Sequence, residues 1–227
     1  MSNVIEAWEP PSLPVAGTAE RFPVRRIYCV GRNYAAHARE MGADEREPPF
    51  FFLKPADAIV QDGATIPYPT KTADLHYEGE LVAAIGTGGR NIAVEDANDH
   101  IFGYAVGIDL TRRDLQNEAK QMRRPWDMGK GFDRSAPCGE IAPASAIGHP
   151  ASGDIWLKVN GAEKQHGDIA DMIWSTPECI AYLSGLMELV PGDLIFTGTP
   201  DGVGPVTSGD AIEVHVASVG YLDIRIG

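Results

Sequence analysis

Two acidic residues separated by one glycine open the apolar run HYEGELVAAIG. Glu78 and Glu80 are two positions apart, and side chains at i and i+2 of a strand project from the same face. A divalent cation is one of the few partners that stabilises two such carboxylates together. The competing interpretation is a solvated strand face, but Val82 and Ala84 continue this face and are apolar. The pattern therefore favours a metal-binding pair.

A third carboxylate, Asp109, ends the apolar run AVGIDLT. An acid in this position often belongs to a site, although it can also cap the helix that follows. Oxygen-only ligands suit Mg²⁺ or Mn²⁺ better than zinc. Three carboxylates around a divalent ion leave a net negative charge, so nearby cations are needed before an anionic substrate can bind. The candidates are Arg112, Arg113 and Lys130, although for any single one of them the spacing alone favours an ordinary surface cation.

The segment NYAAHARE places His37 and Glu40 at i and i+3, which makes them neighbours on one face of a helix. A carboxylate beside an imidazole raises its basicity, and this is how a general base is made. An ordinary surface pair is the alternative, and the spacing alone favours that alternative.

The elements that must position these residues are mostly strands. Strands are expected at residues 25–31 and 76–86, an extended piece at 48–55, and a helix or turn leading into another strand over residues 95–111. A hairpin at 154–168 turns at Asn160-Gly161. Helices are expected at residues 33–42, 112–122 and 175–190, the last with Ser175 or Thr176 as N-cap and Pro177 in its first turn. The sum is a strand-rich α+β domain over residues 24–227, preceded by an extended, proline-rich arm over residues 1–23.

Composition limits the classes of partner. The chain has 227 residues and a formal net charge of −13, which argues against nucleic acid as a partner. Its longest apolar stretches are strand-sized, so no membrane span is expected. Cys29, Cys138 and Cys179 have no disulfide or zinc spacing, and the N-terminus has no secretory pattern, so we expect a cytoplasmic protein.

Seven segments in this order resemble the fumarylacetoacetate hydrolase superfamily in its short, single-domain form. They are VGRNYAAHAREMG, FFFLKP, HYEGELVAAIG, GIDLTRRDLQ, KGFD, KVNGAEKQ and LIFTGTPDGVG. They run in family order from about Val24 to the C-terminus, so the resemblance covers nearly everything except the N-terminal arm. The resemblance implies a mixed β-sandwich roll, a homodimer, and Mg²⁺ or Mn²⁺ held by Glu78, Glu80 and Asp109. It also implies a catalytic dyad of His37 and Glu40. Arg113, Gln116, Lys130 and Thr199 fall where relatives contact substrate or order the site, whereas Arg112 has no such match.

The function that this resemblance implies is hydrolysis of a C–C bond in an acylpyruvate, a small anionic 2-oxo acid. Glu40 would orient His37 to activate water, and Lys130 would stabilise the enolate that leaves. Fumarylpyruvate, giving fumarate and pyruvate, is the expected substrate, because RIYCVGRNYAAHAREMG looks most like the corresponding run of fumarylpyruvate hydrolases. The alternatives are oxaloacetate decarboxylation, and isomerisation or tautomerisation of a 2-oxo-diene diacid on the same metal. A non-catalytic acidic metal-binding protein is the alternative from another class.

Overall fold

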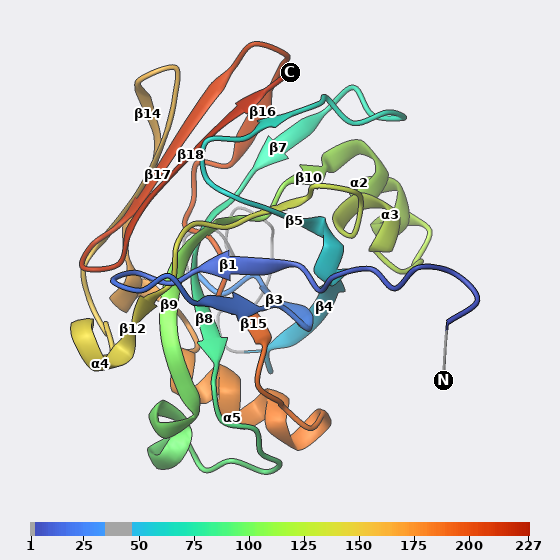
Figure 1. Cartoon of the computed structure of the whole chain (residues 1–227). Helices are drawn as coiled ribbons and strands as arrows, with labels where there is room; N and C mark the ends of the chain where they lie inside the picture. The colour runs from blue at the N-terminus through green and yellow to red at the C-terminus, as the bar shows by residue number, and fades with distance from the viewer. Residues whose placement is uncertain (1–2, 35–46) are drawn as a thin grey trace.

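The protein folds into a strand-rich α+β structure in which two larger β-sheets pack face to face (Figure 1). The computed structural model describes residues 3–34 and 47–227. The expected fold class is confirmed. The helix expected over residues 33–42, with the His37–Glu40 dyad, falls outside the described residues apart from its first two positions.

The first large sheet has six strands and carries the acidic residues. In spatial order its strands are β12 (Ala142–Pro143), β9 (Ile101–Ile108), β8 (Gly79–Ile85), β15 (Asp193–Phe196), β3 (Arg26–Gly31) and β4 (Phe50–Lys54). Strand β15 pairs parallel with β3 and antiparallel with β8, so the sheet is mixed. The C-terminal half of the chain thus supplies a central strand between segments from the N-terminal half.

The second large sheet has five strands. In spatial order they are β14 (Ala162–Asp168), β13 (Asp154–Val159), β17 (Ala211–Val216), β18 (Gly220–Ile226) and β6 (Thr65–Ile66). Strands β13 and β14 form the predicted hairpin. Asn160 and Gly161 at its tip have φ of 52° and 76°, the left-handed values that a type I′ turn requires.

Short elements complete the structure. The remaining strands are β1 (Ser12–Pro14) with β2 (Arg21–Pro23), β5 (Ile59–Val60) with β11 (Ala136–Pro137), and the sheet of β10 (Thr111–Arg112), β7 (Leu75–Tyr77) and β16 (Gly204–Val206). The helices are α2 (Arg113–Gln121), α3 (Asp127–Lys130), α4 (Ala144–Ile147) and α5 (Thr176–Leu186), with short 3-10 helices η1 (Ala56–Ala58), η2 (Val94–His100) and η3 (Ile169–Asp171). The predicted N-cap of α5 is confirmed at Ser175, which forms a capping box with Glu178. None of the helices in the described residues has the length and hydropathy needed to cross a bilayer.

Strand β8 is buried on both faces because each face meets a different layer. Leu81 and Ala83 belong to the core between the two large sheets, whereas Val82 and Ala84 pack with Leu13 and Phe22 of the β1–β2 hairpin. Side chains alternate along a strand, so the even-numbered residues at its start share the second face. The structure therefore confirms that this face is apolar beyond the acidic pair, and it buries the pair.

Candidate active site

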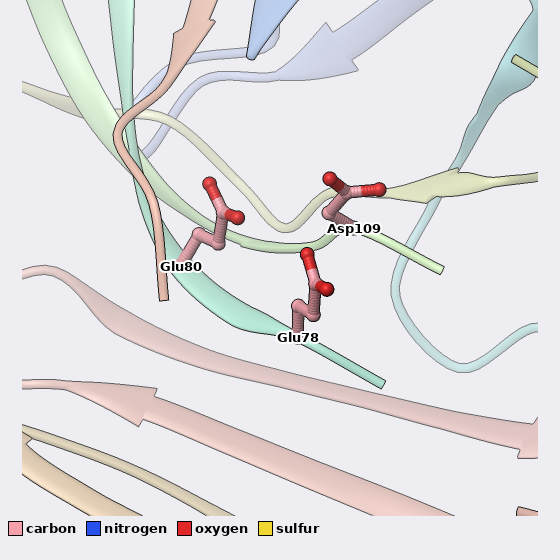
Figure 2. A group of neighbouring side chains, drawn as sticks. All are labelled: Glu78, Glu80 and Asp109. Carbon is pink, nitrogen blue, oxygen red and sulfur yellow. The ribbon is translucent and has the colours of Figure 1, made fainter. Parts of the chain in front are cut away.

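The three predicted carboxylates meet where β8 and β9 run side by side (Figure 2). Glu80 pairs with Gly107 in the antiparallel register, and the backbone N–H of Asp109 donates to the carbonyl oxygen of Glu78 at 2.8 Å. One oxygen of each carboxylate lies within 4.8 Å of those of the other two. Glu78, Glu80 and Asp109 are 5%, 2% and 1% exposed, so a single strand register brings three buried acids together.

Two of the predicted cations are paired with these acids. Lys130 Nζ, from the end of α3, donates to Glu78 Oε2 and to Asp109 Oδ2, both at 2.7 Å. Arg113 Nη2, from the first residue of α2, donates to Glu78 Oε1 at 2.6 Å, and its Nη1 donates to Gln116 Oε1 at 2.7 Å. Burial alone lowers the pKa of Lys130, but the charges of Asp109 and Glu78 outweigh it, and the pKa is raised. The ammonium therefore stays charged beside the cluster.

A third buried cation was not predicted. Lys54 ends the apolar run FFFLK in β4, and its Nζ lies 2.8 Å from Asp109 Oδ1. Lys54 Nζ donates its hydrogen bonds to the carbonyl oxygens of Leu110, at 3.1 Å, and Lys130. Its contact with Asp109 Oδ1 is therefore an ion pair without a directed hydrogen bond. A fully buried lysine is rare unless it is paired. The charge inside an apolar, proline-bracketed strand was the signal in the sequence that could have identified it.

Glu80 differs from the other two acids. Within residues 3–34 and 47–227 it forms no ion pair, and its carboxylate accepts one hydrogen bond, from the Gly198 N–H to Oε2 at 2.8 Å. Burial raises the pKa of Glu80 well above its ordinary value, and the charges of Asp109 and Glu78 raise it further. Among the residues that the structure describes, three buried cations (Lys54, Arg113 and Lys130) lie beside the three carboxylates, yet none of them pairs with Glu80.

These features fit a divalent metal ion. All three donors are carboxylate oxygens, the set that Mg²⁺ and Mn²⁺ prefer. Asp109 Oδ1 accepts no directed hydrogen bond from the described residues. An ion among the three acids would add positive charge beside these carboxylates and favour the ionised form of Glu80. Glu78, Glu80 and Asp109 could therefore hold the ion.

The predicted substrate-contacting residues line one pocket above the cluster. Arg113, Gln116, Lys130 and Thr199 all line it, together with Glu78 and Glu80. Further lining comes from Val30, Gly31, Arg32, Phe52, Lys120, Trp126 and Gly198. The sequence did not single out Arg32 or Lys120 for chemistry.

Arg112, the candidate without a family match, lies elsewhere. Its guanidinium lies over the Phe132 ring at 4.4 Å, and it does not line the pocket. Asp109 does not cap α2, because the residue at that N-cap is Arg112. His37 and Glu40 lie outside the described residues, so their role as a dyad stays a prediction.

Thr199 is tied to the strand that carries the acids. Its hydroxyl donates to the Gly79 carbonyl oxygen at 2.8 Å and accepts from Gln165 Nε2 at 2.8 Å. The hydroxyl proton is thus directed at the backbone. Gln165 Oε1 also accepts from the Gly79 N–H at 2.9 Å. Sequence reasoning missed Gln165 as a residue that supports the site. It lies in a polar hairpin between Lys164 and His166, which are exposed, so nothing in the local sequence marks it as buried.

The protein is a mixed β-sandwich in which a buried cluster of three carboxylates lies at the base of a pocket lined by cations. Such a site suits a metal ion in the cluster and an anion bound next to it in the pocket. The chain belongs to the fumarylacetoacetate hydrolase family: the family model described as fumarylacetoacetate (FAA) hydrolase C-terminal matches residues 26–227. The family is one of enzymes, and the resemblance in the sequence is confirmed.

Solved and curated relatives carry different activities in their names. A crystal structure of fumarylpyruvate hydrolase from Pseudomonas aeruginosa, in complex with Mn²⁺ and pyruvate, is 53% identical, covers 99% of each chain and superimposes with a TM-score of 0.97. The mitochondrial oxaloacetate tautomerase of Arabidopsis thaliana is 42% identical over 201 residues, which are 88% of this chain and 90% of the relative. The structure of 5-carboxymethyl-2-hydroxymuconate delta-isomerase from Mycobacterium smegmatis is 33% identical, with a TM-score of 0.81 over 91% of this chain and 80% of that one.

Proposed function

We propose that this protein is a divalent-metal-dependent hydrolase that cleaves a C–C bond in acylpyruvates, with fumarylpyruvate and water giving fumarate and pyruvate. The observation that carries the proposal is the buried cluster of three carboxylates at the base of a cationic pocket; one of these carboxylates has no cationic partner among the described residues. The 53% identical relative binds Mn²⁺ and pyruvate, one of the two products of this reaction.

The charge of the site supports an anionic substrate. Lys54, Arg113 and Lys130 balance the three carboxylates formally. A divalent ion in the cluster would therefore leave the base of the pocket with two positive charges in excess. A buried positive centre of this kind favours the carboxylate and 2-oxo oxygen of a 2-oxo acid.

The bound ion would supply Lewis-acid polarisation of the 2-oxo group. The chain's own residues do the rest. Lys130 Nζ, held between Glu78 and Asp109, stabilises the negative charge that develops on the pyruvate enolate as it leaves. Gln116 offers its amide N–H groups to the substrate, since its carbonyl oxygen already accepts from Arg113.

The His37–Glu40 dyad completes the proposed mechanism. Glu40 holds the imidazole in one orientation, and His37 removes a proton from the water that attacks the distal carbonyl carbon. Substituting His37 by Ala should remove cleavage and leave metal affinity unchanged. Equal activity in this variant would reject the dyad.

Oxaloacetate tautomerisation or decarboxylation is the second candidate, and the 42% identity with the Arabidopsis thaliana tautomerase favours it. The isomerase relative supports isomerisation in the same way. All of these reactions pass through an enolate, so the acidic cluster serves each of them. They differ in whether water attacks the substrate.

The test is to incubate the purified, metal-loaded protein with acylpyruvates, oxaloacetate and a 2-oxo-diene diacid, and to follow loss of enol absorbance together with product formation. We expect fumarylpyruvate to give one pyruvate per molecule consumed, with activity lost in EDTA and restored by Mn²⁺ or Mg²⁺. Glu80→Gln should abolish turnover, whereas the matched control Glu118→Gln, at an exposed position of α2, should not. Turnover of oxaloacetate alone would replace the hydrolase with the second candidate, and absence of any EDTA-sensitive turnover would favour a metal-binding protein.

A further inference from the structure

The outer part of the pocket holds two cations that the proposed mechanism does not use. Arg32 follows β3, and Lys120 lies on α2, seven positions after Arg113 and four after Gln116. Residues with this spacing share one helix face, so α2 presents a continuous polar face to the pocket. Neither Arg32 nor Lys120 forms an ion pair with a carboxylate in the described part of the chain.

Arg32 is held in place by its neighbour. Its φ is 56°, a left-handed value that residues other than glycine adopt at a cost in free energy. The fully buried Asn33 fixes this conformation: its side chain donates to the carbonyl oxygens of Trp174, at 2.8 Å, and Thr197, at 2.7 Å, and accepts from the Trp174 N–H at 2.8 Å. Arg32 Nε is buried without a hydrogen-bond partner among the described residues. The backbone is thus strained where a cation with an unused donor enters the pocket.

The positively charged side chains that line the pocket repel one another. Burial and, to a smaller extent, the charges of Arg113 and Arg32 together lower the pKa of Lys120 to about 8. Among the described residues, four cations line the pocket (Arg32, Arg113, Lys120 and Lys130), against two carboxylates. Such an arrangement is unfavourable in the empty pocket and becomes favourable when an anion binds between the outer cations.

Aromatic rings connect the outer cations with the inner site. Lys130 Nζ lies 5.0 Å from the centre of the Phe52 ring, and Lys120 Nζ lies 5.1 Å from that of Trp126. The two rings are 5.8 Å apart. The lining between the inner and outer ammonium groups is therefore aromatic, with the two ring planes inclined at 54°, and it offers an apolar surface to the linker of a bound diacid.

We propose that Arg32 and Lys120 form a second carboxylate site, which binds the far carboxylate of a 2-oxo diacid whose 2-oxo acid end lies at the acidic cluster. The unsaturated chain between the two ends lies along Phe52 and Trp126. The inference deepens the proposed function, on which it rests for the position of the 2-oxo acid end. It assigns the preference for a diacid to two residues outside the cluster.

A pair of uncleavable ligands tests the proposal. 2-Oxoheptanedioate and 2-oxoheptanoate have equal chain length and differ only in the terminal carboxylate. Both lack the 4-oxo group that water attacks in an acylpyruvate, so neither can be cleaved. Their affinities for the Mn²⁺-loaded full chain are measured by titration calorimetry. We expect the wild type to bind the diacid about tenfold more tightly or better, the effect of a charge-assisted hydrogen bond.

Lys120→Met and Arg32→Met should each reduce the ratio of diacid to monoacid affinity about tenfold, and Lys120→Arg should keep it. Arg124→Met removes an exposed cation beyond the end of α2 and is the matched control, with an unchanged ratio. An equal loss for both ligands, or no preference in the wild type, would overturn the proposal. The binding result does not depend on cleavage. If the protein prefers the diacid but hydrolyses no acylpyruvate, the proposed reaction is rejected and the second carboxylate site is kept. If it hydrolyses acylpyruvates but shows no preference for the diacid, the reaction is kept and the second carboxylate site is rejected.

Discussion

Glu80 is a buried acid whose environment raises its pKa, and this has a consequence for the metal-free protein. A carboxyl group with a raised pKa binds more protons in the folded than in the unfolded state. Its contribution to the free energy of unfolding therefore falls as the pH rises above 4.5, the group's ordinary pKa. At neutral pH the carboxyl group destabilises the empty site.

Glu80→Gln should accordingly stabilise the metal-free protein at pH 7 by about 1–2 kcal/mol, or roughly 2–8 °C in Tm. The amide still accepts from the Gly198 N–H, so the local hydrogen bond is kept. Thermal unfolding is measured in EDTA and in Mn²⁺. We expect the variant to have the higher Tm in EDTA, and we expect Mn²⁺ to raise the Tm of the wild type but not that of the variant. A variant with lower Tm in EDTA would contradict this prediction.

The pKa of Lys120 is lowered rather than raised, and the same reasoning gives a prediction for the pH dependence of stability. This pKa is about 8 in the folded chain against 10.5 ordinarily, so between these values the folded state binds fewer protons than the unfolded state. The free energy of unfolding then rises with pH in this window. Lys120→Met should be more stable than the wild type at pH 7, and this advantage should vanish near pH 10. Urea unfolding at the two pH values measures it, and an equal difference at both would refute the assignment.

At the level of elements, Gln165 connects the second large sheet with the acidic strand. Its hairpin has a bulge between Leu157 and Lys158 and their partners, and the buried Gln165 amide reaches both Gly79 and Thr199. Gln165→Leu removes these bonds and leaves the buried Gly79 N–H without its partner, at about 1–3 kcal/mol, while the Thr199 hydroxyl keeps its bond to the Gly79 carbonyl oxygen. We expect lower stability in urea and weaker Mn²⁺ binding, because Gly79 lies between Glu78 and Glu80. Weaker stability with unchanged metal affinity would show that the bonds do not position the acids.

The elements that could be predicted from the sequence are those set by local patterns. The Asn160-Gly161 turn, the capped helix after Ser175 and the alternation along β8 each depend on residues close in sequence. The order of strands could not be predicted in this way. Nothing near Asp193 indicates that β15 lies between β3 and β8, since this placement depends on packing across the whole core.

The same division applies to the site. The i, i+2 spacing of Glu78 and Glu80 predicted their shared face, but neither Lys54 nor Lys120 could be placed beside them from local spacing. The ion pair between Lys54 and Asp109 joins β4 to the end of β9 across the sheet. Side chains brought together by tertiary structure leave only a weak signal, such as a charge in an apolar strand.

On the scale of the whole molecule, the three cysteines are all free and buried. Burial raises the pKa of Cys138 and Cys179 to about 12 and that of Cys29 well above its usual range. Thiolates are the reactive form, so none of the three should react with a disulfide reagent in the native state. A titration should give no reaction under native conditions and three equivalents in denaturant. Fast labelling of a native thiol would contradict this account of the core.

Several predictions about the whole molecule remain open to measurement. The division into an arm over residues 1–23 and a single catalytic domain, the homodimer and the cytoplasmic location stay predictions. Residues 12–23 contribute Leu13 and Phe22 to the core, whereas Val4 and Trp8 are exposed. Molar mass in solution, with and without residues 1–9, tests whether these exposed side chains join two copies.

The backbone pairing of β8 with β9 also bears on how the protein can change during evolution. The register of β8 against β9, from Gly79 to Ile85, sets the distance between the two glutamates and Asp109. The loop and the 3-10 helix η2 that connect these two strands do not belong to the paired region. Insertions or deletions within residues 86–100 thus preserve the chemistry, whereas a one-residue slip would turn both glutamates to the opposite face. Descendants of this chain can vary in length there and acquire new substrates through residues such as Arg32 and Lys120, while the reactive centre is inherited unaltered.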